Sequence, residues 1–122
     1  MENLELAKLV LKQADTYPET FDMNVFCEIG PCGTVACIAG HALLLSGMYS
    51  VVTEHDEHTY LLEPDGELLA ADEGIRKAQC LLGMSDAERF AGNSYNDIFY
   101  DFQDGLSRFR ELTESSSAQD VP

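Results

Sequence analysis

Hydrophobic and polar positions follow a helical period at the start of the chain. Between residues 3 and 16, apolar side chains recur at spacings of three and four, and charged side chains fall on the opposite face. This pattern predicts an amphipathic helix that lies on a hydrophobic core, with Asn3 as its N-cap. We expect the helix to end at Tyr17, because a residue that precedes a proline disfavours the helical conformation.

The next strong feature is a stretch without formal charge, residues 29–53, in a chain that contains 22 acidic residues. Such a stretch indicates the part of the chain that is buried on folding. Thr34 is the expected N-cap of an apolar helix over residues 35–46, which Gly47 ends. Neighbouring elements can approach this helix closely, because it carries the small residues Ala36, Ala39, Gly40 and Ala42.

Two segments rich in β-branched and aromatic residues follow, at residues 48–53 and 59–63. They flank a polar run and therefore predict a β-hairpin with a charged tip at residues 54–58. The earlier segment 21–26 carries two phenylalanines and alternates only in part, so a short strand and an ordered loop both remain open for it.

Two further helices are expected in the following segment. The first begins at residue 67 or 72, runs to residue 82 and ends at Gly83. Ser85 and Glu88 have the spacing of a capping box, which predicts a short helix that continues through residue 91.

A last helix is expected after a cap within residues 94–97, because apolar side chains then recur at helical spacing up to Leu112. Gly105 inside this pattern suggests a kink or a close contact. Residues 115–122 have nothing to bury and are expected to form a flexible tail. The sequence thus predicts a compact single domain over residues 1–114. Its fold class is α+β, mainly α-helical, with four to five helices and a small β-hairpin.

Net charge limits the partners of this chain, since it is −15 and the sequence pI is near 4.2. Direct binding to nucleic acid needs clustered Lys and Arg, and an anionic membrane repels an acidic chain, so we expect neither. The expected partner is a cationic protein surface, a metal ion or a groove that normally holds nucleic acid. The alternative interpretation is that acidity only keeps a small protein soluble.

Two further signals concern location. The chain does not open with a cationic segment followed by an apolar one, which argues against a signal peptide. Its longest apolar run is far shorter than the roughly 20 residues of a membrane span. We therefore expect a cytoplasmic protein whose four cysteines are thiols.

Charge is also unevenly distributed along the chain. Between Gln13 and Ile75 there are twelve acidic residues and no Lys or Arg. An ordered array of carboxylates with few cations can imitate the phosphates of DNA. The predicted partner-binding residues on this acidic surface are Glu54, Asp56, Glu57, Glu63, Asp65, Glu67, Asp72 and Glu73.

Cys27, Cys32, Cys37 and His41 are candidate metal ligands, because thiolate and imidazole are the usual ligands of zinc. All four lie within one short segment, and none of the cysteines form the CxxC pair typical of zinc sites. The spacing favours a small buried Cys37 and a His41 that packs against a helix, so we expect no metal ion and no cofactor. A disulfide between Cys32 and Cys37 stays open.

Cys37 could instead be a thiol nucleophile, because a helix N-terminus lowers a cysteine pKa and His41 could serve as its base. A base one turn along the same helix points away from the reacting centre, however, so we do not expect an enzyme. At the hairpin tip, His55 and His58 could bind a divalent metal weakly, although such a tip is more often a solvated turn.

Three segments carry a resemblance to a known family: FDM at residues 21–23, CGTVACIAGHA at residues 32–42 and LLGMSDAERFAG at residues 81–92. The chain resembles a family of small uncharacterised proteins of bacteria, plasmids and bacteriophages, which share an FDM…CGTxACxAGxA motif and a C-terminal LLG segment. The resemblance implies an origin in a mobile element. It also implies structural roles for Cys32, Gly33, Thr34, Cys37 and Gly40.

The chain departs from this family at identifiable positions. The family often has tryptophan at the positions of Phe26 and His41, which weakens the case for His41 as a ligand or a base. The second motif here lacks the usual proline and the aromatic residue after the leucine.

Together these observations predict a non-enzymatic acidic protein that binds a protein with a basic surface. The narrower hypothesis is a phage or mobile-element inhibitor of the anti-defence, nucleic-acid-mimic type, which presents its acidic half to a basic nucleic-acid-handling protein of the host. Two alternatives remain: a metal- or redox-responsive module that uses Cys27, Cys32, Cys37 and His41, and a cysteine-dependent enzyme.

Overall fold

The computed structural model describes residues 1–30, 33–53 and 59–119. In chain order its helices are α1 (Leu4–Thr16), α2 (Ile38–Leu45), α3 (Ala71–Leu82), α4 (Asp86–Phe90) and α5 (Gly105–Gln119), with 3₁₀ turns η1 (Pro18–Thr20) and η2 (Ile98–Tyr100). Its strands are β1 (Cys27–Gly30), β2 (Gly33–Ala36), β3 (Ser50–Thr53), β4 (Thr59–Leu62) and β5 (Leu68–Leu69). The predicted α+β class, mainly helical with a small β part, is confirmed.

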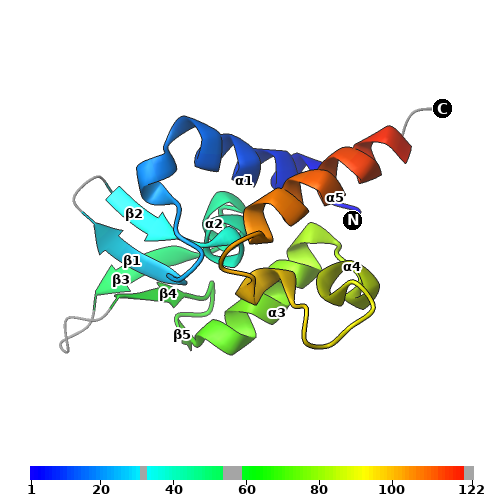
Figure 1. The fold of residues 1–122 in the computed structure, drawn as a ribbon. Coiled ribbons are helices and arrows are strands. Elements are labelled where there is room, and N and C mark those ends of the chain that lie inside the picture. The colour runs from blue at the N-terminus through cyan, green and yellow to red at the C-terminus, as the bar shows by residue number, and fades with distance from the viewer. Residues whose placement is uncertain (31–32, 54–58, 120–122) are drawn as a thin grey trace.

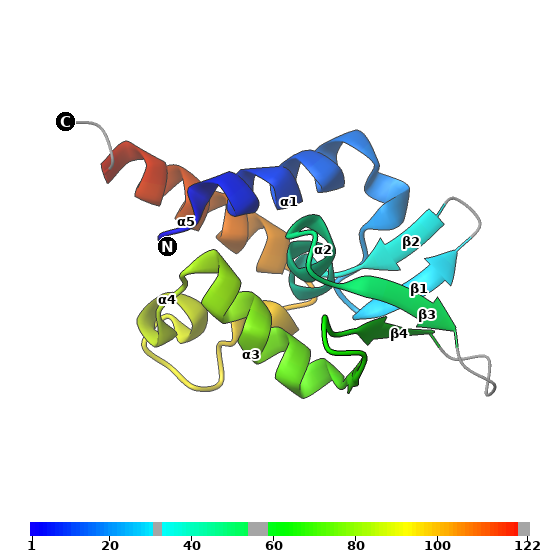
Figure 2. The ribbon, with the colours of Figure 1, turned by 180° about the vertical axis from the view of Figure 1, so that it is seen from behind.

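The strands gather at one end of the molecule, and the helices α3, α4 and α5 lie towards the other, with α2 between them (Figures 1 and 2). β1 and β2 form one antiparallel pair, and β3, β4 and β5 form a second antiparallel sheet in that order. The predicted hairpin is therefore confirmed as β3 and β4. Its predicted tip, with Glu54, Asp56 and Glu57, lies outside the described residues.

Helix α1 begins where the sequence predicted. The side-chain oxygen of Asn3 accepts the backbone N–H of Leu6 at 3.2 Å and so caps the helix. The side-chain amide of Asn3 also donates to the carbonyl of Leu81 at 2.9 Å, near the end of α3. Gly83 ends α3 in the left-handed conformation, with φ of 65°, as its position predicted. One asparagine thus joins the start of α1 to the end of α3.

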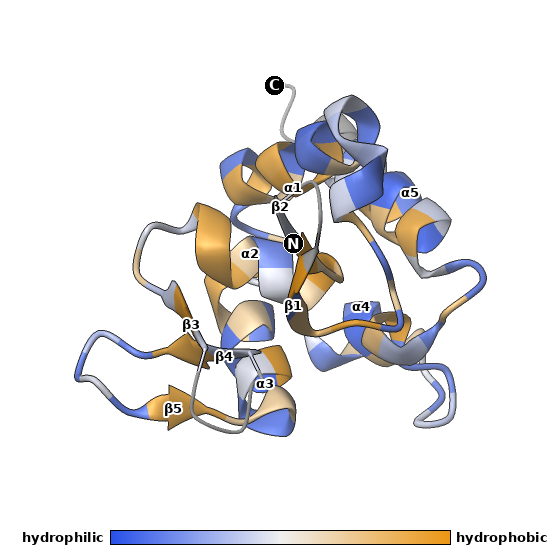
Figure 3. Ribbon diagram, turned by 90° about the vertical axis from the view of Figure 1, so that its left-hand side faces the viewer, coloured by the Kyte–Doolittle hydropathy of each residue, from blue (hydrophilic) through white to orange (hydrophobic). Residues whose placement is uncertain are grey.

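The central segment corrects one prediction. Residues 33–36 form strand β2 rather than the first turn of a helix, and α2 begins only at Ile38, with Cys37 and not Thr34 at the N-cap. The backbone N–H and C=O groups of β2 form hydrogen bonds with β1, and the apolar pattern of the sequence gives no sign of this pairing. Helix α2 is buried from Ile38 to Leu43 and is mostly orange in the hydropathy view (Figure 3).

Close packing around α2 depends on Phe26. A Cβ atom on Gly40 of α2 would overlap the backbone carbonyl oxygen of Phe26, and one on Gly74 of α3 would overlap its ring. Phe26 therefore lies between two helices whose glycines make the approach possible. The segment before it is a loop rather than a strand, with a single bridge from Phe21 to Ala36.

The predicted last helix is interrupted. The side chain of Asp97 accepts the backbone N–H of Phe99 at 3.0 Å and so caps the start of the short 3₁₀ turn η2. The side chain of Asp101, at the end of η2, accepts the backbone N–H of Asp104 at 2.9 Å just before α5 begins. Gly105 is the first residue of α5, and a Cβ there would lie 2.6 Å from a side-chain carbon of Met23, which is the close contact that its position suggested.

Helix α5 also extends further than expected. The predicted tail began at residue 115, whereas the helix continues to Gln119. Once a helix is nucleated, each added residue costs little, so residues with nothing to bury can still continue it. Among the described helices, none is both long and apolar enough to cross a bilayer.

Candidate functional site

Cys37 lies at the N-cap of α2 and is almost fully buried, with 4% of its surface exposed. Backbone N–H groups at the start of α2, those of Ala39 and Gly40, point to its sulfur and favour the thiolate. Burial has the larger effect and raises the pKa of the Cys37 thiol above its usual value. The predicted lowering of this pKa is therefore wrong, because removal from water outweighs the helix terminus.

His41 is turned towards the loop that follows α1. Its Nε2 atom lies 2.6 Å from the backbone carbonyl oxygen of Thr20. A carbonyl oxygen only accepts, so Nε2 carries the proton and donates. The ring also stacks on Phe21, with centroids 5.8 Å apart and planes 9° from parallel. Burial lowers the pKa of His41, so the neutral imidazole holds this loop against α2.

The remaining candidate ligands do not complete a metal site. Cys27 is half-buried on β1, where burial and the neighbouring Cys37 raise its pKa to about 11. Cys32 lies outside the described residues. In the described part of the chain, no group of three or more His, Cys, Asp or Glu side chains is placed to hold a metal ion.

Among the described acidic residues between Gln13 and Ile75, two are paired with cations. Glu63 forms an ion pair with Lys77 of α3, and its side chain is 14% exposed. Asp15 receives two hydrogen bonds from the Arg110 guanidinium, the shorter at 2.6 Å, and this contact lowers the pKa of Asp15. Glu63 was predicted to bind a partner, but its carboxylate is already engaged within the fold.

Four other predicted carboxylates remain exposed. Asp65, Glu67, Asp72 and Glu73 lie at the β4–β5 turn and the first turn of α3, and we call them the acidic face. None of the four forms an ion pair with a described residue. The exposed Arg76 on the next turn of α3 likewise forms no ion pair with a described carboxylate. The acidic face therefore has no direct counter-ion within the described part of the chain.

Cations elsewhere in the molecule are held by other carboxylates. Arg89 forms two hydrogen bonds to Asp97, at 2.8 and 3.1 Å, and Arg108 forms one to Asp101 at 3.1 Å. With the ion pairs of Lys77 and Arg110, four of the seven Lys and Arg residues form ion pairs within the fold. Positive charge is thus used to hold the fold together, mainly in its C-terminal part.

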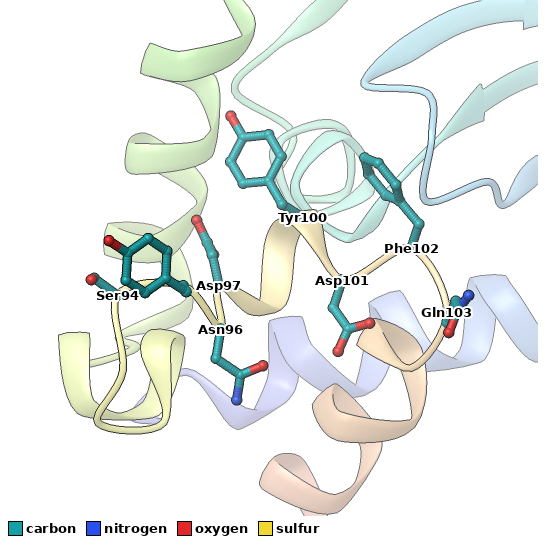
Figure 4. Close-up of a pocket in the computed structure, with 8 residues that line it drawn as sticks. Ser94, Asn96, Asp97, Tyr100, Asp101, Phe102 and Gln103 are labelled. Carbon is teal, nitrogen blue, oxygen red and sulfur yellow. The ribbon is translucent and has the colours of Figure 1, made fainter.

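Sequence reasoning missed a second exposed feature, at the connection between α4 and α5. Tyr95, Tyr100 and Phe102 are 96%, 48% and 54% exposed, and we call them the aromatic patch. They line a hollow of about 620 Å³ (Figure 4). The helical period had assigned Phe102 to the core, but the interruption before α5 turns it outwards. The polar neighbours of Tyr95 were the only signal in the sequence that could have indicated this exposure.

Comparisons of the chain with protein-family models, with curated proteins and with solved structures find no match. The resemblance carried by residues 21–23, 32–42 and 81–92 therefore stays a prediction. The segment 81–92 has a structural explanation of its own, because Ser85 and Glu88 cap α4 reciprocally at 3.1 and 2.9 Å.

Thiol reactivity tests the burial of Cys37. In a Cys32→Ser background at pH 8, we expect iodoacetamide to modify exposed Cys80 first, half-buried Cys27 more slowly and Cys37 only when the protein opens, because the thiolate is the reacting species. Cleavage after Glu28 separates Cys27 from Cys37 for mass spectrometry. Modification of Cys37 at the rate of Cys80 would contradict its assignment as a buried residue and restore it as a candidate nucleophile.

Acid sensitivity tests the role of His41. Its folded pKa lies below the usual 6.5, so stability is complete above pH 6.5 and falls as the unfolded chain takes up a proton that the folded chain does not. Between pH 7.5 and 5.5 we expect this residue to cost up to about 1.4 kcal/mol of the free energy of unfolding.

Urea denaturation of the wild type and of His41→Gln measures this cost, since glutamine can donate to Thr20 but does not titrate. The two proteins share all other acid-sensitive groups, so only the difference between their pH profiles is interpreted. Profiles that run parallel would show that the imidazole is not buried in its neutral form.

Proposed function

We propose that this protein is a non-enzymatic binding protein that presents its acidic face to a basic surface of another protein in the cytoplasm. One observation carries the proposal. The carboxylates of Asp65, Glu67, Asp72 and Glu73 are exposed without ion pairs to described residues, whereas most of the chain's cations are paired elsewhere. A surface of this kind attracts cations more strongly than the net charge alone suggests.

Electrostatic complementarity acts mainly on the rate of association and on the choice of partner. Carboxylates without a counter-ion steer a basic surface into contact, and salt screens this attraction over about 10 Å at 0.1 M ionic strength. The same field repels nucleic acid and anionic membranes. The proposed partner is therefore a basic protein, and binding should weaken as salt rises.

The narrower hypothesis, an inhibitor from a phage or mobile element that occupies a nucleic-acid groove, is a special case of this proposal. It shares the acidic face and adds that the partner normally binds nucleic acid. Membership of the family with the FDM…CGTxACxAGxA motif belongs to this narrower hypothesis. Competition between the protein and DNA or RNA for the same partner would distinguish it from other acidic binding proteins.

The two alternative functions have less support. A thiol enzyme needs an accessible thiolate, whereas Cys37 is buried with a raised pKa, and Nε2 of His41 is engaged by the carbonyl of Thr20. A metal- or redox-responsive module would depend on Cys32, which lies outside the described residues. Both alternatives rely on Cys37 and His41, which are buried, rather than on exposed residues.

Charge neutralisation of the acidic face tests the proposal. In the variant Asp65→Asn, Glu67→Gln, Glu73→Gln, we expect at least tenfold weaker binding to the main basic protein captured from the native host, because three charges that form no ion pair within the described chain are removed from the contact. Asn at position 65 keeps the oxygen that accepts the Glu67 backbone N–H at 3.1 Å, so the turn is retained. Isothermal titration calorimetry at two salt concentrations gives the dissociation constants.

A matched control removes the same number of charges on the side of α1 and α5. Glu5→Gln, Glu111→Gln, Glu114→Gln changes exposed carboxylates outside the acidic face and should leave binding within about twofold of the wild type. An equal loss of affinity in the two variants would show that binding depends only on net charge and not on the acidic face. No loss of affinity in either variant would contradict the proposal.

A further inference from the structure

We propose that the aromatic patch of Tyr95, Tyr100 and Phe102 is a docking surface for arginine side chains of the basic partner. This inference rests on the proposed function and extends it, since it adds a recognition element to the acidic face. The three side chains line one hollow and are 96%, 48% and 54% exposed. Exposed aromatic side chains gathered in one place are typical of interaction surfaces.

The connection that carries the patch is held firmly by polar contacts. Arg108 donates to the backbone carbonyl of Asn96 at 2.8 Å and to its side-chain oxygen at 3.2 Å. The side chain of Asn93 accepts the backbone N–H of Tyr95 at 2.9 Å. The backbone is thus ordered while the rings stay in solvent, so a partner would pay little conformational entropy to use them.

Tyr100 and Phe102 project from the same side of the chain, whereas Asp101, between them, projects to the other side (Figure 4). This alternation gives two ring faces on one surface of the connection. The hydroxyl of Tyr100 donates to the carboxylate of Asp72 at 3.0 Å. Since Asp72 is part of the acidic face, the aromatic patch and the acidic face are continuous.

Charge decides which partner group fits the patch. Asp72, which accepts the Tyr100 hydroxyl, and Asp104, two residues after Phe102 in the chain, are exposed and form no ion pairs with described residues. Of the nearby arginines, Arg89 and Arg108 are already bound to Asp97 and Asp101. Arg76, one turn after Asp72 on α3, forms no ion pair with a described carboxylate. Ring faces next to carboxylates that form no ion pair attract a cation. A guanidinium group fits best, because it is planar and can stack on an aromatic ring.

The same region of the molecule already binds a guanidinium group in this way. The central carbon of the Arg89 guanidinium lies 4.7 Å from the ring centroid of Phe90 and 5.4 Å from that of Phe99, while its nitrogens donate to Asp97. Rings and a carboxylate therefore hold an arginine from within the chain. The aromatic patch offers the same combination of groups, exposed rings beside a carboxylate, to an arginine from outside.

Titration of the isotopically labelled full chain with the peptide acetyl-Gly-Arg-Gly-Arg-Gly-Arg-amide tests the proposal by NMR. We expect the largest shift changes in residues 94–104, including the rings of the patch. The same peptide with citrulline in place of arginine keeps the shape but loses the charge and should bind at least tenfold more weakly. Tyr95→Ala, Phe102→Ala should weaken binding of the arginine peptide at least fivefold.

Tyr17→Ala is the matched control, because Tyr17 is also half-exposed, at 52%, but lies outside the patch. It should leave peptide affinity unchanged, and dispersed amide spectra confirm that each variant is folded. Shift changes confined to Asp65, Glu67 and Glu73 would overturn this inference and leave the proposed function standing. Equal affinity for the arginine and citrulline peptides would also overturn it. If neither the aromatic patch nor the acidic face showed shift changes, both this inference and the proposed function would be contradicted.

Discussion

The packing of Phe26 between α2 and α3 is the contact on which the rest of the structure depends. Gly40 lets the Phe26 backbone lie against α2, and Gly74 lets its ring lie against α3. Any larger side chain at either position would occupy space that Phe26 already fills. Because Phe26 directly precedes β1, this contact also fixes the β1–β2 pair beside the helices. The position of the β1–β2 pair relative to α2 and α3 therefore depends on one aromatic residue and two glycines.

This arrangement separates the inside of the molecule from its interaction surfaces. The motif around α2 supplies the buried side chains of Cys37 and His41, whose polar atoms are engaged with backbone groups. The acidic face and the aromatic patch belong to turns and helix ends on the outside, where packing places no demand on them. Residues that look reactive in the sequence thus support the fold, and residues without a motif form the candidate site.

Local chemistry explains which predictions were right. As helix caps, Asn3, Ser85 and Gly83 act within one or two helical turns of their own positions, so the sequence indicates these capping roles directly. Strand β2 could not be predicted in the same way, since its identity depends on pairing with β1. The exposure of Phe102 depends on a helix interruption made by side-chain caps, which hydrophobic spacing does not register.

A double-mutant cycle for Phe26 and Gly74 tests this picture of the fold most directly. Alanine in an open helix is favoured over glycine by about 1 kcal/mol. We expect Gly74→Ala instead to lower the free energy of unfolding by about 1–3 kcal/mol, because its Cβ meets the Phe26 ring. With Phe26→Leu in the same chain, urea denaturation should recover at least about 1 kcal/mol relative to the sum of the single changes. Additive effects, or a stabilising Gly74→Ala, would contradict the central role of this contact.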